Sequence, residues 1–383
     1  MAAREETPHG RARLAWLDNL RTAMIFLVVV FHCGLVYETS GVAGFFWIVF
    51  DFSGHPLASL PNLAVIDIFV MSTVFFISGY LTLPSLRRTR GRDFLAGKAR
   101  RLLAPWLIAC LTLIPLYKVI FLYSRGMPQQ AWTSYFPWSN GAISQNWLWF
   151  LPVLFLFDAV FLLLSRSRLK WPSLSVPQAV TAVFAIGLAW SVAMNMAGLE
   201  GWTKTPLLDF QNERLLIYFL MFGLGAFCYQ RGVLAGPWQR SILFPAVLAT
   251  VWIPVAVYRH FYILRMSGSD AVVVAPLADT LLAWTAFHLA LFGLVYLSVQ
   301  VSRRWMDGGS PLSRELGANT YSVYIVHTVV LGGIALLLVD SGLPAVLRFP
   351  VLALSTYAAS TVLVSVYRRL LKPQLRGLGL SAT

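Results

Sequence analysis

The stretch LAWLDNLRTAMIFLVVVFHCGLVYET, residues 14–39, decides the fold. It starts with a few polar residues and continues as an apolar run long enough to enter a bilayer as a helix. Arg21 and His32 are eleven residues apart, which is about three helical turns and about 16 Å along the axis, so their side chains share one face. Asp18 lies one turn before Arg21 on nearly the same face. The stretch therefore predicts a membrane helix with a single polar stripe.

The rest of the chain has the composition of an integral membrane protein. Of its 383 residues, 58% are hydrophobic and only 12% are charged, and the mean hydropathy is +0.68. A soluble domain of this length needs far more charged surface. In lipid, backbone polar groups must be paired inside the spanning segment, which favours helices. The three cysteines all lie in apolar runs, as expected for small buried side chains rather than disulfides or metal ligands.

Apolar runs recur along the chain and divide it into membrane spans. We predict an all-α integral membrane protein that forms a single membrane domain over residues 1–383, with no soluble domain. The ten predicted spans cover roughly residues 20–38, 61–83, 101–123, 147–164, 175–197, 213–230, 241–258, 273–300, 316–339 and 348–371.

Positive charge is distributed unevenly between these spans. The chain carries 30 Lys and Arg residues and a net charge of +14. Most of the basic residues precede the first span, follow the last, or lie in alternate loops such as 87–101. Because cytoplasmic segments are enriched in Lys and Arg, both ends of the chain are predicted to be cytoplasmic. The charge then reflects topology in a lipid bilayer, and no nucleic-acid partner is expected.

His32 is the strongest functional candidate in the first span. A titratable ring at bilayer depth is costly unless it faces protein or water, which favours a functional role. The alternative is a structural histidine that is hydrogen-bonded to a neighbouring helix. Arg21, taken alone, would be interpreted as an anchor that extends its guanidinium to the interface.

Five sequence patterns then occur in the order found in one known family. The first is Arg, ten residues, His, and the others are FFISGYL (75–81), FLAGKARRLLAPW (94–106), NWLWFLPVLFLFD (146–158) and LGANTYSVYIVH (316–327). Over the whole chain they resemble acyltransferase family 3, a family of integral membrane proteins. In detail the chain is similar to the branch that includes glucan biosynthesis protein C, a periplasmic glucan succinyltransferase.

This resemblance implies a membrane O-acyltransferase. It implies that an acetyl or succinyl group moves from cytoplasmic acyl-CoA to a hydroxyl of an extracytoplasmic carbohydrate, such as a periplasmic glucan or a surface polysaccharide. It also implies a multi-pass protein of the bacterial inner membrane with no permanently bound cofactor. His32 is then expected to act as general base, either for direct attack by the acceptor or through a covalent acyl-histidine.

A general base needs an orienting partner. Candidates within spans are Asp67, Asp158, Glu38, His288 and His327. Asp67 lies at a plausible depth and is predicted to be the second catalytic residue, although a structural polar group at a helix end would look the same.

The remaining site residues follow from charge and spacing. Polyanionic coenzyme A is expected to bind among basic residues of the cytoplasmic side, for which topology alone is the alternative explanation: Arg21, Arg88, Arg100 and Arg101. Asp18, Tyr324 and His327 are expected to line the cavity, because Thr320, Tyr324 and His327 share one helix face. The outer segment 124–146 suits either an interfacial belt or stacking on a sugar. No residues have metal-ligand spacing, so no metal is expected.

Two other classes of function remain open at this point. A transporter or exporter of a lipid-linked sugar or small molecule would use intramembrane His and Asp as a proton relay. It would account for His32 but not for the pairing of His32 with Arg21. A sensor or scaffold without chemistry would give the imidazole of His32 no function.

Overall fold

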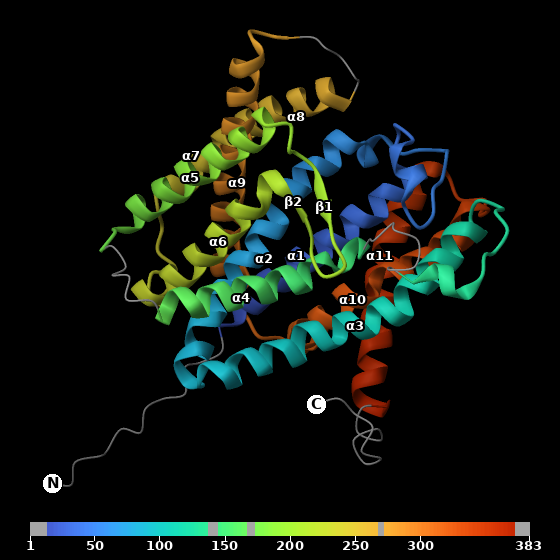
Figure 1. Ribbon diagram of the computed structural model, residues 1–383, viewed down its shortest axis with the longest axis horizontal. Coiled ribbons are helices and arrows are strands. Elements are labelled where there is room, and N and C mark those ends of the chain that lie inside the picture. Colours follow the sequence, from blue (N-terminus) through green and yellow to red (C-terminus); the bar gives the residue numbers. More distant parts are fainter. Residues whose placement is uncertain (1–13, 137–144, 167–172, 267–271, 372–383) are drawn as a thin grey trace.

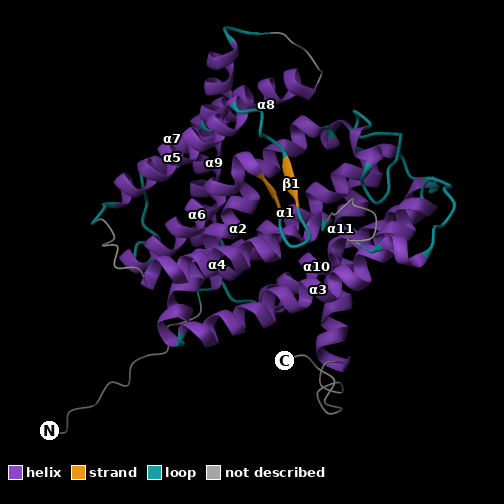
Figure 2. Cartoon of the chain, viewed as in Figure 1, coloured by secondary structure: helices purple, strands orange, loops and turns teal. Residues whose placement is uncertain are grey.

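The computed structural model describes residues 14–136, 145–166, 173–266 and 272–371. These residues form a bundle of helices with one small β-hairpin, which is the only sheet in the described ranges (Figure 2). The helices are α1 Ala15–Gly34, α2 Leu60–Arg88, α3 Gly91–Tyr123, α4 Phe150–Arg166, α5 Val176–Met196, α6 Asn212–Arg231, α7 Leu243–Thr250, α8 Trp252–Met266, α9 Pro276–Trp305, α10 Pro311–Val339 and α11 Ala345–Val366. The strands β1 Trp202–Lys204 and β2 Asp209–Gln211 pair antiparallel.

The helices form two groups around a central set (Figure 1). α5, α7, α8 and α9 lie on one side, and α3, α10 and α11 lie on the other. α1, α2 and α6 lie between them, and α1 packs against both α2 and α10. Each of the ten predicted spans overlaps one helix, or the consecutive pair α7 and α8.

Within the described ranges, nine helical segments are long and apolar enough to cross a membrane. α7 and α8 together form one of these segments, and α6 is not among them. α6 carries Glu213, Arg214 and Arg231 near its ends, which lowers its apolar character. The protein is therefore an all-α multi-pass membrane protein. Large apolar side chains remain exposed on the outer helices, such as Ile108 on α3 and Leu363 on α11, as lipid-facing surfaces require.

The basic segment after the second span is helical, although it was predicted to be a loop. α2 extends to Arg88, and α3 already begins at Gly91, so residues 89–90 alone separate the two helices. Leu, Ala, Lys and Arg are good helix formers, and they dominate FLAGKARRLLAPW. The predicted spans covered only the apolar part of each helix, so the second span was predicted to end too early, at 83, and the third to begin too late, at 101.

α2 and α6 approach each other more closely than any side chain would permit. A Cβ atom added to Gly225 would lie 2.0 Å from the carbonyl oxygen of Phe76, and one added to Gly79 would lie 1.8 Å from that of Phe222. Small residues allow such backbone contact between membrane helices. This contact fixes the position of α2, which forms one wall of the cavity described below.

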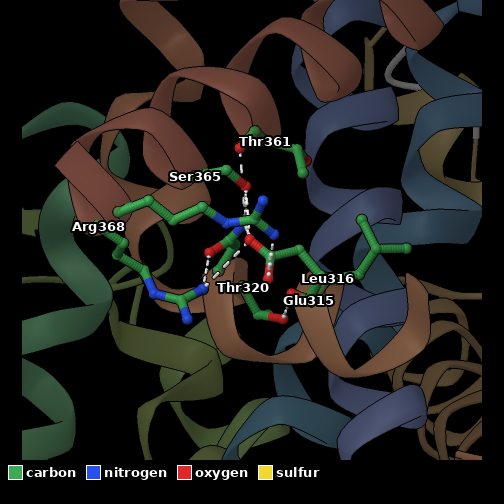
Figure 3. Close-up of polar contacts among 8 residues, drawn as sticks. Glu315, Leu316, Thr320, Thr361, Ser365 and Arg368 are labelled. Carbon is green, nitrogen blue, oxygen red and sulfur yellow. Dashed lines mark hydrogen bonds and ion pairs between the residues drawn. The ribbon is translucent and has the colours of Figure 1, made fainter. Parts of the chain in front are cut away.

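A polar cluster joins α10 to α11 and the π-helical turn Tyr367–Leu371 (Figure 3). Asn319 is fully buried, and its amide nitrogen donates to the hydroxyl of Ser365 at 2.7 Å. Arg368 donates to the amide oxygen of Asn319, and Ser365 donates to Glu315 at 2.8 Å. Because the buried amide is satisfied on both sides, α10 is held firmly against α11.

The two ends of the bundle differ in chemistry. We call the end that contains the β-hairpin and the loop 35–58 the hairpin end, and the end where α1 begins and α2 and α9 finish the basic end. At the hairpin end, Arg125 donates to the carbonyl oxygens of Gly44 and Trp47 at 2.6 and 2.8 Å. Arg348 pairs with Asp51 at 2.9 Å. These contacts fix the loop that carries Trp47.

Candidate functional site

A cavity of about 600 Å³ opens at the hairpin end. It lies between α1, α2, the loop that carries Trp47, the segment before α4 and the β-hairpin. Its volume is in the range of small-molecule sites. The polar lining residues are His32, Asp67, Asn146, Lys204, Asp209 and Gln211. Aromatic residues form most of the remaining wall: Phe31, Phe46, Trp47, Trp147, Trp149, Trp202, Tyr218, Tyr262 and Tyr324.

His32 lines this cavity and contacts a second histidine. Its Nδ1 lies 2.8 Å from Nε2 of His327, which is fully buried on α10. The ring of Trp47 is stacked against that of His32, with centroids 4.9 Å apart and planes 18° apart. The imidazole is thus held between α10 and the loop at the hairpin end.

The hydrogen-bond partners of His327 assign the protons of both rings. Nδ1 of His327 lies 2.7 Å from the carbonyl oxygen of Tyr324, which only accepts, so this nitrogen carries a proton and donates it. In a neutral ring, Nε2 of His327 then accepts the bond from Nδ1 of His32. The second nitrogen of His32, Nε2, is left with its lone pair. It has no hydrogen-bond partner among the described residues, so it is free to accept a proton in the cavity.

Asp67 lines the same cavity, but it does not contact His32. Its carboxylate pairs with Arg214 of α6, whose guanidinium also donates to the hydroxyl of Tyr258 at 3.1 Å. His327, rather than Asp67, is therefore the hydrogen-bond partner of His32. A carboxylate in this position can still contact a bound molecule, because its side chain is 30% exposed.

The other candidate partners of His32 have different contacts. Asp158 is fully buried and pairs with Lys98 at 3.0 Å. Glu38 accepts from the backbone N–H of Ser40. His288 contacts the carbonyl oxygen of Trp284 at 2.8 Å through Nδ1. Asp158 therefore links α4 to α3, whereas Glu38 and His288 form these bonds within their own segments. No group of His, Cys, Asp or Glu in the described ranges is arranged to hold a metal ion.

The predicted donor residues lie at the basic end, away from His32. Arg21 pairs with Asp18 at 3.2 Å and donates to the carbonyl oxygen of Gly317 at 3.0 Å. The exposed Arg88, Arg100 and Arg101 belong to the same end. None of these residues lines the cavity that contains His32, and neither do Asp18 and His327, whereas Tyr324 does.

A second cavity, of about 480 Å³, lies at the basic end. Asn19, Thr22 and Phe26 of α1 form one side of it, next to Arg21 in the sequence. Trp305, at the end of α9, and the linker to α10 form the other side. Hydroxyl groups of Ser310 and Ser313 also line this space, so it offers an aromatic surface together with small polar groups.

The β-hairpin contributes to the site, and this contribution was not predicted from the sequence. Trp202, Lys204, Asp209 and Gln211 all come from it. Asp209 accepts backbone N–H bonds from Gln145 at 2.8 Å and Thr205 at 3.3 Å. Burial raises the pKa of the Asp209 carboxyl, and these N–H bonds act in the opposite direction. Asp209 therefore ties the hairpin to the segment before α4.

The aromatic residues of the cavity were also missed as a group. The outer segment 124–146 suggested a belt or sugar stacking, and its last residue, Asn146, lines the cavity together with the next residue, Trp147. Residues 137–144 of this segment lie outside the described ranges. Trp147 donates to the carbonyl oxygen of Ile325 at 2.9 Å, and Tyr324 donates to that of Trp147. These two bonds hold Trp147 against α10, the helix that also carries His327.

Comparison with known proteins adds the family. No curated protein and no solved structure matches this chain. The family model described as an acyltransferase domain matches residues 14–366, which is nearly the whole chain and includes both histidines. The chain thus belongs to acyltransferase family 3 and is a multi-pass membrane acyltransferase.

Proposed function

We propose that this protein transfers an acyl group, acetyl or succinyl, from cytoplasmic acyl-CoA to a hydroxyl of an extracytoplasmic carbohydrate. The observation that supports this most strongly is the open Nε2 of His32 at the wall of an aromatic cavity. The acceptor is a periplasmic glucan or surface polysaccharide, and the protein acts in the bacterial inner membrane with both ends in the cytoplasm. The hairpin end is then the acceptor side.

The lining of the cavity supports a carbohydrate acceptor. Sugar rings have apolar faces that stack on aromatic side chains and hydroxyl edges that need hydrogen-bond partners. Trp47, Trp147, Trp149 and Trp202 offer such faces in one cavity. The carboxylate of Asp67 and the amides of Asn146 and Gln211 in the same lining offer partners for hydroxyls.

The basic end supports an acyl-CoA donor. Its phosphates are polyanionic and would be attracted to Arg88, Arg100 and Arg101. The second cavity is lined by Thr22, the sequence neighbour of Arg21, and by Trp305, on which an adenine ring can stack. Arg21 and His32 lie on one face of α1, so the pantetheine arm would follow this helix toward the imidazole.

The proposed reaction needs only the residues described. Nε2 of His32 removes the proton of the acceptor hydroxyl, and the oxygen forms a bond to the thioester carbon. The bond from that carbon to sulfur breaks, and the protonated imidazole returns the proton to the thiolate of coenzyme A. His327 accepts the hydrogen bond from Nδ1 of His32 throughout and so stabilises the imidazolium.

The test is an acyl-transfer assay with the purified protein in proteoliposomes. Acetyl-CoA and succinyl-CoA serve as donors, and methyl glycosides and envelope glycans serve as acceptors. We expect an ester on the acceptor, detected by mass spectrometry, and free coenzyme A in equal amount. If the protein instead moves labelled glycan across the membrane and forms no ester with either donor, it is a transporter and the proposal is wrong.

His327 is expected to act by positioning His32. Replacing His327 by leucine removes the acceptor for Nδ1 of His32, and we expect acyl transfer to fall by roughly 10- to 100-fold. Glutamine offers a carbonyl oxygen at a similar reach, so His327→Gln should retain more activity than His327→Leu. Initial rates of acyl transfer at saturating acetyl-CoA measure the difference. Equal rates in the two variants would contradict the positioning role.

A further inference from the structure

Asp67 lines the cavity, and only one of its two carboxylate oxygens is paired with a described residue. Arg214 binds Oδ2, whereas Oδ1 has no hydrogen-bond partner among the residues that the structure describes. The side chain is 30% exposed and belongs to the cavity wall. An oxygen in this state accepts a hydrogen bond from a molecule that enters the cavity.

The carboxylate is held rigidly by its surroundings. The side chain of Arg214 is only 5% exposed, and its guanidinium lies 4.9 Å from the ring centroid of Phe287. Tyr258 accepts a further bond from the same guanidinium at 3.1 Å. A buried arginine keeps its charge, so it holds Asp67 in one orientation before any acceptor arrives. A carboxylate that is already oriented binds a hydroxyl without an added entropy cost for ordering its own side chain.

Asp209 provides the contrast within the same cavity. Both of its carboxylate oxygens already accept backbone N–H groups, from Gln145 and from Thr205. Asp209 therefore stabilises the hairpin through these bonds, although it also lines the cavity wall. Of the two carboxylates in the described lining, only Asp67 has an oxygen that accepts no hydrogen bond from another described residue.

We propose that Oδ1 of Asp67 binds a hydroxyl of the acceptor other than the one that is acylated. This inference rests on the proposed function. The acylated hydroxyl meets Nε2 of His32, and a second hydroxyl of the same molecule donates to Asp67. The acceptor class is then a polyhydroxylated ring with at least two free hydroxyls. Asp67 is a specificity-determining residue, whereas the proton is removed by His32.

The experiment compares acceptors that differ by one hydroxyl. Methyl glucoside, galactoside and mannoside are first ranked, and the best is then compared with its monodeoxy analogues. Acyl transfer from acetyl-CoA gives kcat/KM, and quenching of the cavity tryptophans gives binding without catalysis. For the natural chain we expect one analogue that retains the acylated hydroxyl to lose roughly 10- to 100-fold in both measurements. Discrimination here means the ratio of kcat/KM, or of affinity, for the full glycoside to that for this analogue. In Asp67→Asn the ratio should fall to near unity, because the charged hydrogen-bond acceptor is gone.

Two further variants keep the test decisive. Glu200 is also paired with an arginine, Arg265 at 2.8 Å, but it does not line the cavity, so Glu200→Gln should retain the natural discrimination. Asp67→Asn leaves Arg214 buried without its counter-charge and can unfold the protein. Asp67→Glu keeps the charge but moves the oxygen, so a folded Asp67→Glu protein with weakened discrimination also supports the proposal. Unchanged discrimination in a folded Asp67 variant overturns it.

The outcomes separate this inference from the proposed function. Normal acyl transfer to a glycoside, with no effect of Asp67 on hydroxyl preference, removes the inference and leaves the function standing. Binding of glycosides that depends on Asp67, without any ester product, supports the subsite and removes the acyl transfer. Failure of all three glycosides to bind overturns the inference together with the carbohydrate acceptor.

Discussion

Replacement of His32 by alanine is expected to lower acyl transfer by roughly 10²- to 10⁴-fold, the range associated with a lost general base. The variant removes the only ring nitrogen in the described cavity lining that has a free lone pair. It leaves His327 able to donate to the carbonyl oxygen of Tyr324, so α10 keeps its local structure. Initial rates with acetyl-CoA, together with size-exclusion chromatography in detergent, measure activity and folding.

A matched control is available on the same chain. His260 is exposed on α8, its ring contacts Phe261 edge to face, and it is not among the residues that line the cavity. His260→Ala should therefore leave the rate of acyl transfer near that of the natural protein. A folded His32→Ala protein with normal activity would show that another group removes the proton.

Replacement of Gly225 by valine is expected to prevent correct packing of α6 on α2. Even a Cβ atom at this position lies 2.0 Å from the carbonyl oxygen of Phe76, and backbone cannot move aside as a side chain can. We expect the free energy of unfolding to fall by about 3 kcal/mol or more, which is the upper part of the range for overpacked cores. Thermal unfolding in detergent and the yield of monodisperse protein measure this effect.

Gly223 on the same helix is the control for helix propensity. A Cβ atom added to Gly223 meets no described atom within 4 Å. Gly223→Ala should leave stability unchanged or raise it by about 0.5–1 kcal/mol, because alanine favours helix over glycine. If Gly225→Val is as stable as Gly223→Ala, the close contact of α2 with α6 does not exist in the membrane.

The parts of the site that lie on single helices could be predicted from the sequence. Spacing alone placed Arg21 and His32 on one face of α1, and it placed Tyr324 and His327 on one face of α10. Both faces do point toward each other, since the two imidazoles are hydrogen-bonded. Periodicity gives the direction of a side chain around its own axis, and here this was enough to select His327 as one of several candidate partners.

Contacts between distant segments could not be predicted in this way. Asp67 looked like a partner of His32 because both lie at similar depth, yet its carboxylate meets Arg214, which is 147 residues away. Depth in a span does not determine which neighbouring helix a side chain faces. Trp202 gave no signal either, because the strands of the hairpin are only three residues long and their alternation is too short to recognise.

The pairing of α1 with α10 also has a consequence for biosynthesis. His327 follows His32 in the chain by 295 residues. Until the later helix has been inserted, the imidazole on α1 lacks its hydrogen-bond partner, and a partly synthesised chain is expected to have much lower activity. Full activity then depends on the arrival of α10 beside α1 in the membrane.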